Sequence, residues 1–139
     1  MKPLSNTVII LIIAKICGRV SASRLHKIIY ILKMKHDIPL SLDYQTSPSI
    51  YSNDLEYTLG VLVAFSLLDV QIISRREYID RIYKVTEKGL RMLENSLKDE
   101  NTERMSNQLK LYIREMEDLP INELVVQARR YIHHTVRKI

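Results

Sequence analysis

The stretch "DVQIISRREYIDRIYKVT", residues Asp69 to Thr86, decides the fold. Its two ends are rich in Ile, Val and Tyr, which favour β-strands, and its middle is charged. It therefore predicts two short strands that are joined near residues 75–78. Because this junction lacks Gly, Asn and Pro, we expect an irregular tip rather than a tight two-residue turn.

Two helices are predicted in the first part of the chain. The first begins near a polar cap at residues 5–6 and runs to about Cys17, because Gly18 then favours its end. The second, "RLHKIIYILKMK", follows a serine cap at residues 21–23 and repeats apolar residues on one face. The residues after it contain two Pro and several Ser and Asp, which predicts a connecting loop.

A third helix is predicted within "SPSIYSNDLEYTLGVLVAF", residues 47–65. Asn53 and Glu56 have the spacing of a capping box, and Ser52 is the alternative cap. From residue 59 to residue 68 the chain is apolar almost all round. We therefore expect this helix to be buried on most of its surface.

Thr86 can cap a fourth helix, and two amphipathic helices follow, the last of which begins at Pro120. This order predicts a mainly α fold with a small β-hairpin wing (α+β), which is a winged helix-turn-helix followed by C-terminal helices. We assign residues 1–98 to the winged-helix domain and residues 99–139 to a C-terminal helical extension, a dimerisation arm.

The end of the hairpin and the next helix, "YKVTEKGLRMLE", resemble the ending of winged-helix regulators of the MarR-like and PadR-like kinds. In those proteins a Tyr-x-Leu-Thr-x-x-Gly string closes the wing. The matching residues here are Tyr83, Val85, Thr86 and Gly89.

A narrower resemblance covers roughly residues 8–93. "SRLHKIIYILK" followed by "PSIYSNDLEYTLGVLVAFSLLD" is similar to the YwgA-like proteins of archaea, although Ser47 stands where those proteins have Gly. The resemblance implies a winged helix. It implies no biochemical role, because YwgA-like proteins have none that is well defined.

The charge of the chain bears on its partner. A net charge of +5 permits nucleic acid, and both the second helix and the hairpin carry bases. We expect a non-enzymatic winged-helix protein that binds double-stranded DNA, a homodimeric transcription regulator. Lys and Arg side chains would contact the phosphates, and the start of the third helix would contact the edges of the nucleobases. The candidate nucleic-acid contacts are Arg24, Lys27, Ser49, Tyr51, Ser52, Asn53, Arg75, Arg76 and Arg81.

The third helix also supports an alternative. Residues 41–74 contain four acids and no Lys or Arg. Asp54 and Glu56 complement the helix dipole at an N-terminus, but they would repel phosphates. In this alternative, residues 49–53 only cap and orient the helix, and the acidic 41–74 surface makes the winged helix a protein–protein interaction module for a basic partner. The sequence leaves both interpretations open.

The C-terminal helices carry apolar stripes that have two possible uses. They can fold back on the core, or they can pair with a second copy of the chain. Two amphipathic helices appended to a complete small domain favour dimerisation. The candidate dimer contacts are Leu109, Ile113, Met116, Leu124 and Ile132.

We expect no catalytic residue, metal or cofactor. Adjacent His133 and His134 point about 100° apart on a helix, so they cannot easily share a metal. The single Cys17 excludes an intramolecular disulfide and fits a cytoplasmic protein. The longest apolar run, Val8 to Ala14, is far shorter than the ~20 residues that a membrane span needs, so no membrane partner is expected.

Overall fold

A computed structural model describes residues 4–137, and the side chains of residues 4–132. These residues form six helices and one three-stranded antiparallel sheet, in which β3 lies between β1 and β2. The mainly helical α+β fold is confirmed. The helices are α1 (Asn6–Cys17), α2 (Ala22–Lys35), α3 (Asn53–Ala64), α4 (Glu87–Ser96), α5 (Glu100–Arg114) and α6 (Ile121–Arg137). The strands are β1 (Val20–Ser21), β2 (Leu68–Ser74) and β3 (Ile79–Val85).

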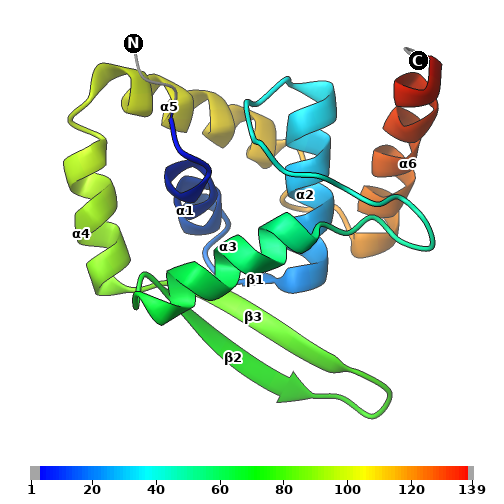
Figure 1. Cartoon of the computed structure of the whole chain (residues 1–139), viewed down its shortest axis with the longest axis horizontal. Coiled ribbons are helices and arrows are strands. Elements are labelled where there is room, and N and C mark those ends of the chain that lie inside the picture. The colour runs from blue at the N-terminus through cyan, green and yellow to red at the C-terminus, as the bar shows by residue number, and fades with distance from the viewer. Residues whose placement is uncertain (1–3, 138–139) are drawn as a thin grey trace.

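Helix α1 is the centre of the fold. Its residues from Ile9 to Ala14 are all buried, as expected of a helix that is apolar all round. It packs against α3, α4, α5 and β3, while α6 packs against α2 (Figure 1). The longest apolar run of the sequence is therefore the central core helix.

The predicted helix starts are set by side-chain caps. The hydroxyl groups of Ser5, Ser21 and Thr86 accept hydrogen bonds from the first turns of α1, α2 and α4. Gly18 ends α1 with a φ of 77°, a conformation that favours glycine. Gly89 is also required, because a Cβ atom there would overlap the main-chain oxygen of Leu67.

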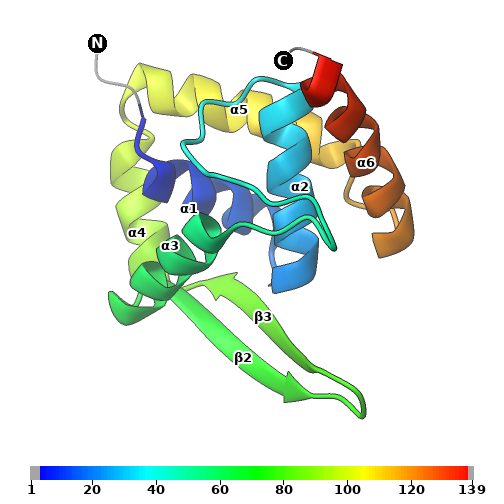
Figure 2. The same cartoon turned by 45° about the vertical axis from the view of Figure 1, so that its right-hand side comes forward.

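The predicted hairpin is confirmed. Strands β2 and β3 pair from Leu68 opposite Val85 to Ser74 opposite Ile79, and residues 75–78 join them. Figures 1 and 2 show the hairpin tip projecting beyond the helices. The short strand β1, which pairs with β3, was not predicted, because two residues give no periodic signal.

Helix α3 departs from two expectations. Its cap is Ser52, whose hydroxyl accepts from the Leu55 N–H at 3.0 Å, so the predicted capping box from Asn53 to Glu56 is wrong. The expected burial on most of its surface is also wrong. Only one side of α3 is buried, and Tyr57 is 76% exposed. The helix lies at the edge of the body, so its outer side meets solvent (Figure 1).

The C-terminal helices fold back on the core. Leu109, Ile113, Met116 and Leu124 are buried in their own chain, and Ile132 packs partly buried against the same core. Because α5 covers α1 and α6 covers α2, these side chains are not free to pair with a second copy. Their predicted role as dimer contacts is therefore corrected to intrachain packing. The homodimer itself stays a prediction.

Candidate interaction surface

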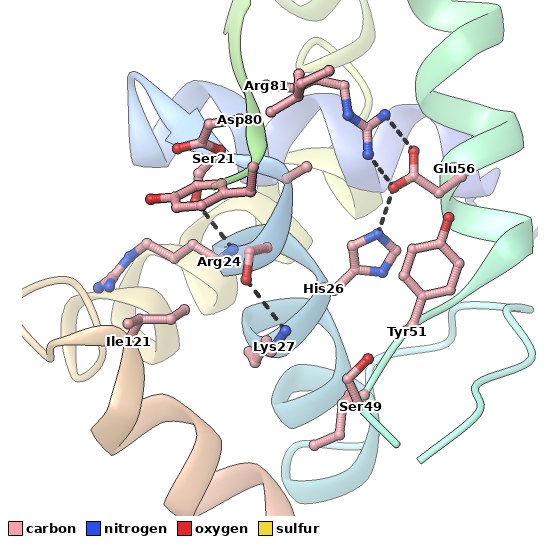
Figure 3. Close-up of a pocket in the computed structure, with 15 residues that line it drawn as sticks. Ser21, Arg24, His26, Lys27, Ser49, Tyr51, Glu56, Asp80, Arg81 and Ile121 are labelled. Carbon is pink, nitrogen blue, oxygen red and sulfur yellow. Dashed lines mark hydrogen bonds and ion pairs between the residues drawn. The ribbon is translucent and has the colours of Figure 1, made fainter. Parts of the chain in front are cut away.

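A groove of about 610 Å³ opens where the first turns of α2 and α3 meet the hairpin and the start of α6 (Figure 3). This volume lies within the ~300–1,000 Å³ typical of ligand sites. The groove is lined by Ser21, Ala22, Ser23, Arg24, His26, Lys27, Ser49, Ile50, Tyr51, Glu56, Tyr78, Ile79, Asp80, Arg81 and Ile121.

The carboxylate of Glu56 is neutralised inside the chain. Both of its oxygens accept hydrogen bonds from the guanidinium of Arg81, at 2.6 and 2.7 Å, and His26 Nε2 lies 2.9 Å from Oε1. Burial acts to raise the pKa of Glu56, but the hydrogen bonds from Arg81 and His26 together outweigh it and lower that pKa. This acid of α3 therefore stays ionised and already has its counter-charge.

The imidazole of His26 is held neutral in one tautomer. The Ser52 main-chain N–H donates to Nδ1 at 3.1 Å, so Nε2 carries the hydrogen that is donated to Glu56. Burial lowers the pKa of His26, against the opposing effect of Glu56. The ring of Tyr51 stacks on His26 with centroids 4.5 Å apart. His26 thus joins α2 to the start of α3.

Two predicted nucleic-acid contacts are corrected, and the third, Arg81, stays a prediction although it is already paired. Ser52 is fully buried, because its hydroxyl caps α3. The guanidinium of Arg24 donates to three main-chain oxygens between α5 and α6, those of Met116, Glu117 and Leu119, at 2.6 to 3.0 Å. It therefore holds the C-terminal helices in place. The charge of Arg81 is balanced by Glu56.

The other predicted contacts divide into two groups. Lys27, Ser49 and Tyr51 line the groove. Burial lowers the pKa of the Lys27 amine, and repulsion from Arg129 adds to the effect. Asn53 is exposed outside the groove, and the two arginines at residues 75–76 are exposed at the hairpin tip.

Exposed apolar side chains near the groove were missed by sequence reasoning. Tyr78, Ile79 and Ile121 line it and are 61%, 70% and 43% exposed. Ile72, which is 67% exposed, pairs with Arg81 across the hairpin and so shares its face. The sequence did contain a signal for one exposed apolar side chain on the hairpin. The adjacent Ile72 and Ile73 break strand alternation, so two neighbouring apolar side chains must face opposite sides.

The described residues give no sign of metal chemistry or of a membrane span. No group of three or more His, Cys, Asp or Glu residues that could hold a metal occurs in this part of the chain. The side chains of His133 and His134 lie outside the described residues. Among the described helices, none has the length and apolar character that crossing a bilayer requires.

Comparison of the chain with protein-family models, with curated proteins and with solved structures finds no match. The fold and the groove are therefore the basis for assigning a function.

Proposed function

We propose that the protein is a polypeptide-binding module whose binding surface is the groove together with the outer face of α3 and the hairpin. One observation carries the proposal. Three large, exposed apolar side chains, Tyr78, Ile79 and Ile121, line one groove. Exposed apolar side chains that gather in one place are typical of interaction sites, and buried aromatic and aliphatic anchors carry most binding energy.

The charges of this surface fit a polypeptide better than a polyanion. The groove wall contains both Lys27 and Asp80, and Arg81 is matched by Glu56. The exposed side of α3 carries Asp54 and no Lys or Arg. A partner segment with apolar side chains and flanking bases would satisfy this pattern, because apolar groups would fill the groove and bases would face the acids.

The arrangement of elements supports a winged helix put to this use. The chain order α1, β1, α2, α3, β2, β3 and the sheet order β1, β3, β2 agree with a winged helix. In this interpretation α3 is the helix that would read DNA. Its exposed face instead offers Tyr57, which is 76% exposed. We infer that the winged helix serves protein assembly, and that catalysis is not its function.

Selection from a library of displayed random peptides tests the proposal. Immobilised full-length protein should enrich peptides that combine large apolar residues with Lys or Arg. Tyr78→Ser combined with Ile79→Ser should then weaken binding of the enriched peptides about tenfold or more, measured by fluorescence anisotropy. Leu111→Ser is the matched control, because Leu111 is 62% exposed on α5 and does not line the groove. Equal binding by the groove variant would refute the proposal.

DNA binding is a second candidate, which one observation favours. Arg75 and Arg76 are adjacent and exposed at the projecting hairpin tip, and no ion pair engages them among the described residues. Replacing both with Ala should reduce the salt dependence of duplex binding by about two phosphate contacts. Anisotropy at two salt concentrations measures this slope. No detectable duplex binding at low salt would dismiss the candidate.

A further inference from the structure

A second cavity, of about 330 Å³, lies between α1, α4 and α5, and none of the described residues that line it belongs to α3, the hairpin or α6. Its floor is apolar. Ile12 and Leu93 are buried there, and Ile16 and Leu97 are half-buried. The floor thus offers a hydrocarbon chain a surface that excludes water.

The rim of this cavity is positively charged. Lys15 from α1 and Lys110 and Arg114 from α5 line it, and all three are exposed. None of the three forms an ion pair within the described part of the chain. Of the described residues on this rim, Glu117 is the one acid, so one negative charge faces three positive charges.

The spacing of two of these cations is unfavourable for the helix alone. Lys110 and Arg114 are four residues apart on α5, so their side chains lie on the same face. Like charges at this spacing destabilise a helix, whereas an anion between them would remove the repulsion. Ser106, one turn earlier, adds a hydroxyl group to the cavity wall.

We propose that this cavity binds a small amphipathic carboxylate, a linear alkyl acid whose chain lies on the apolar floor. Its carboxylate would accept hydrogen bonds from Lys110 and Arg114, with Lys15 adding charge. The site is separate from the polypeptide-binding groove, so either proposal can fail without the other. The ligand needs both a carboxylate and a long alkyl group, because an alcohol would lack the charge and a short acid would lack the alkyl group.

Isothermal titration calorimetry of the full chain with hexanoate, octanoate and decanoate tests whether the apolar floor binds the alkyl group. Each methylene that the floor covers should tighten binding about fourfold, until the chain outgrows the cavity. Decanoate should bind at least about tenfold more tightly than 1-decanol and decyltrimethylammonium, because a carboxylate gains charge-assisted hydrogen bonds. No decanoate binding at millimolar concentration, or equal binding of all three head groups, would overturn the proposal.

Lys110→Gln combined with Arg114→Gln tests the rim. This variant should bind decanoate at least about tenfold more weakly and leave 1-decanol binding unchanged. Lys84→Gln is the matched control, because Lys84 is an exposed lysine on the hairpin and does not line the cavity. An unchanged urea midpoint for both variants shows that the fold is intact. Decanoate binding that the rim variant leaves unchanged would contradict the proposal.

An anionic membrane also presents negative charge next to hydrocarbon chains. Flotation with vesicles of phosphatidylglycerol is therefore a further test. We expect the protein to stay unbound in vesicle flotation, since its three rim cations surround a cavity that holds one alkyl group. Flotation that Lys110→Gln with Arg114→Gln abolishes, without decanoate binding by the wild-type chain, would assign the rim to a lipid surface and overturn the proposed carboxylate site.

Discussion

Helices α5 and α6 bury their apolar stripes in their own chain, whereas α3 and the hairpin leave large apolar side chains in solvent. Leu109 on α5 is 0% exposed, and Ile79 on the hairpin is 70% exposed. The difference follows from position. The C-terminal helices cover α1 and α2, while the outer side of α3 and the hairpin tip extend beyond the body.

An apolar stripe in the sequence therefore shows which side chains favour burial, but it does not show what covers them. The stripes of α5 and α6 have the spacing of dimer contacts, yet the same chain covers them. Among the described residues, none covers the apolar side chains near the hairpin tip. An interaction surface is therefore identified by exposed apolar side chains that gather in one place.

Removing whole elements should affect stability most strongly. Truncation after Ser96 removes α5 and α6, and with them buried side chains such as Leu109 and Ile113. We expect the truncated chain to lack a cooperative unfolding transition, measured by circular dichroism in urea, because α1 and α2 lose their cover. Replacing residues 75–78 with Asn-Gly should keep the transition. A truncated chain that unfolds cooperatively would mean that α5 and α6 are a separate arm.

Single substitutions in α5 and in the hairpin should differ in their effect on stability. Ile113→Ala should lower the free energy of unfolding by about 2–5 kcal/mol, as expected for a fully buried aliphatic side chain. Ile79→Ala should change it by about 0.5 kcal/mol or less, because that side chain is already exposed. Urea denaturation of both variants measures the two values. Similar losses would show that the hairpin apolar side chains are also covered.

Acidification gives a smaller effect, to which His26 on the α3 side contributes. His26 has a pKa below 6.5 in the folded chain, so the unfolded chain binds its proton first as the pH falls. Stability should therefore be fully present well above pH 6.5 and decrease as the pH falls through 6.5 toward the lowered pKa of the folded chain. Glu56 contributes at lower pH, because its lowered pKa keeps it ionised until the pH falls below 4.5.

Two variants show which histidine causes this pH dependence of stability. His26→Gln should reduce the difference in unfolding free energy between pH 7.5 and pH 5. His36→Gln is the control, since burial also lowers the pKa of His36 but its side chain is less buried than that of His26. If His36→Gln removed the larger share of the difference, the buried histidine between α2 and α3 would not be its source.

Local features of this fold could be predicted from the sequence. The caps at Ser5, Ser21 and Thr86 act over three residues, and the hairpin follows from β-branched residues around a charged junction. The network at the groove could not be predicted. Its ion pair joins Glu56 to Arg81, 25 residues away, and its histidine lies 30 residues before Glu56. No period or motif records such contacts.

The use of each apolar stripe could not be predicted either, because it depends on tertiary packing. The α3 sequence is apolar almost all round and predicts a buried helix, yet Tyr57 faces solvent. Similarly, nothing near Arg24 indicates that its guanidinium binds main-chain oxygens more than 90 residues away. Arg24, which the sequence predicts as a phosphate contact, thus holds the C-terminal helices against α2 instead.

Amide hydrogen exchange of the full chain, alone and with the tightest enriched peptide, tests the central claim most directly. In the free chain we expect slow exchange in α5 and fast exchange at residues 75–78, because only the former is packed in the core. With peptide, exchange should slow at residues 75–81 and at the start of α3, and stay unchanged in α5. Slowing confined to α5 and α6, with none in the hairpin, would contradict the claim that α3 and the hairpin form the binding surface.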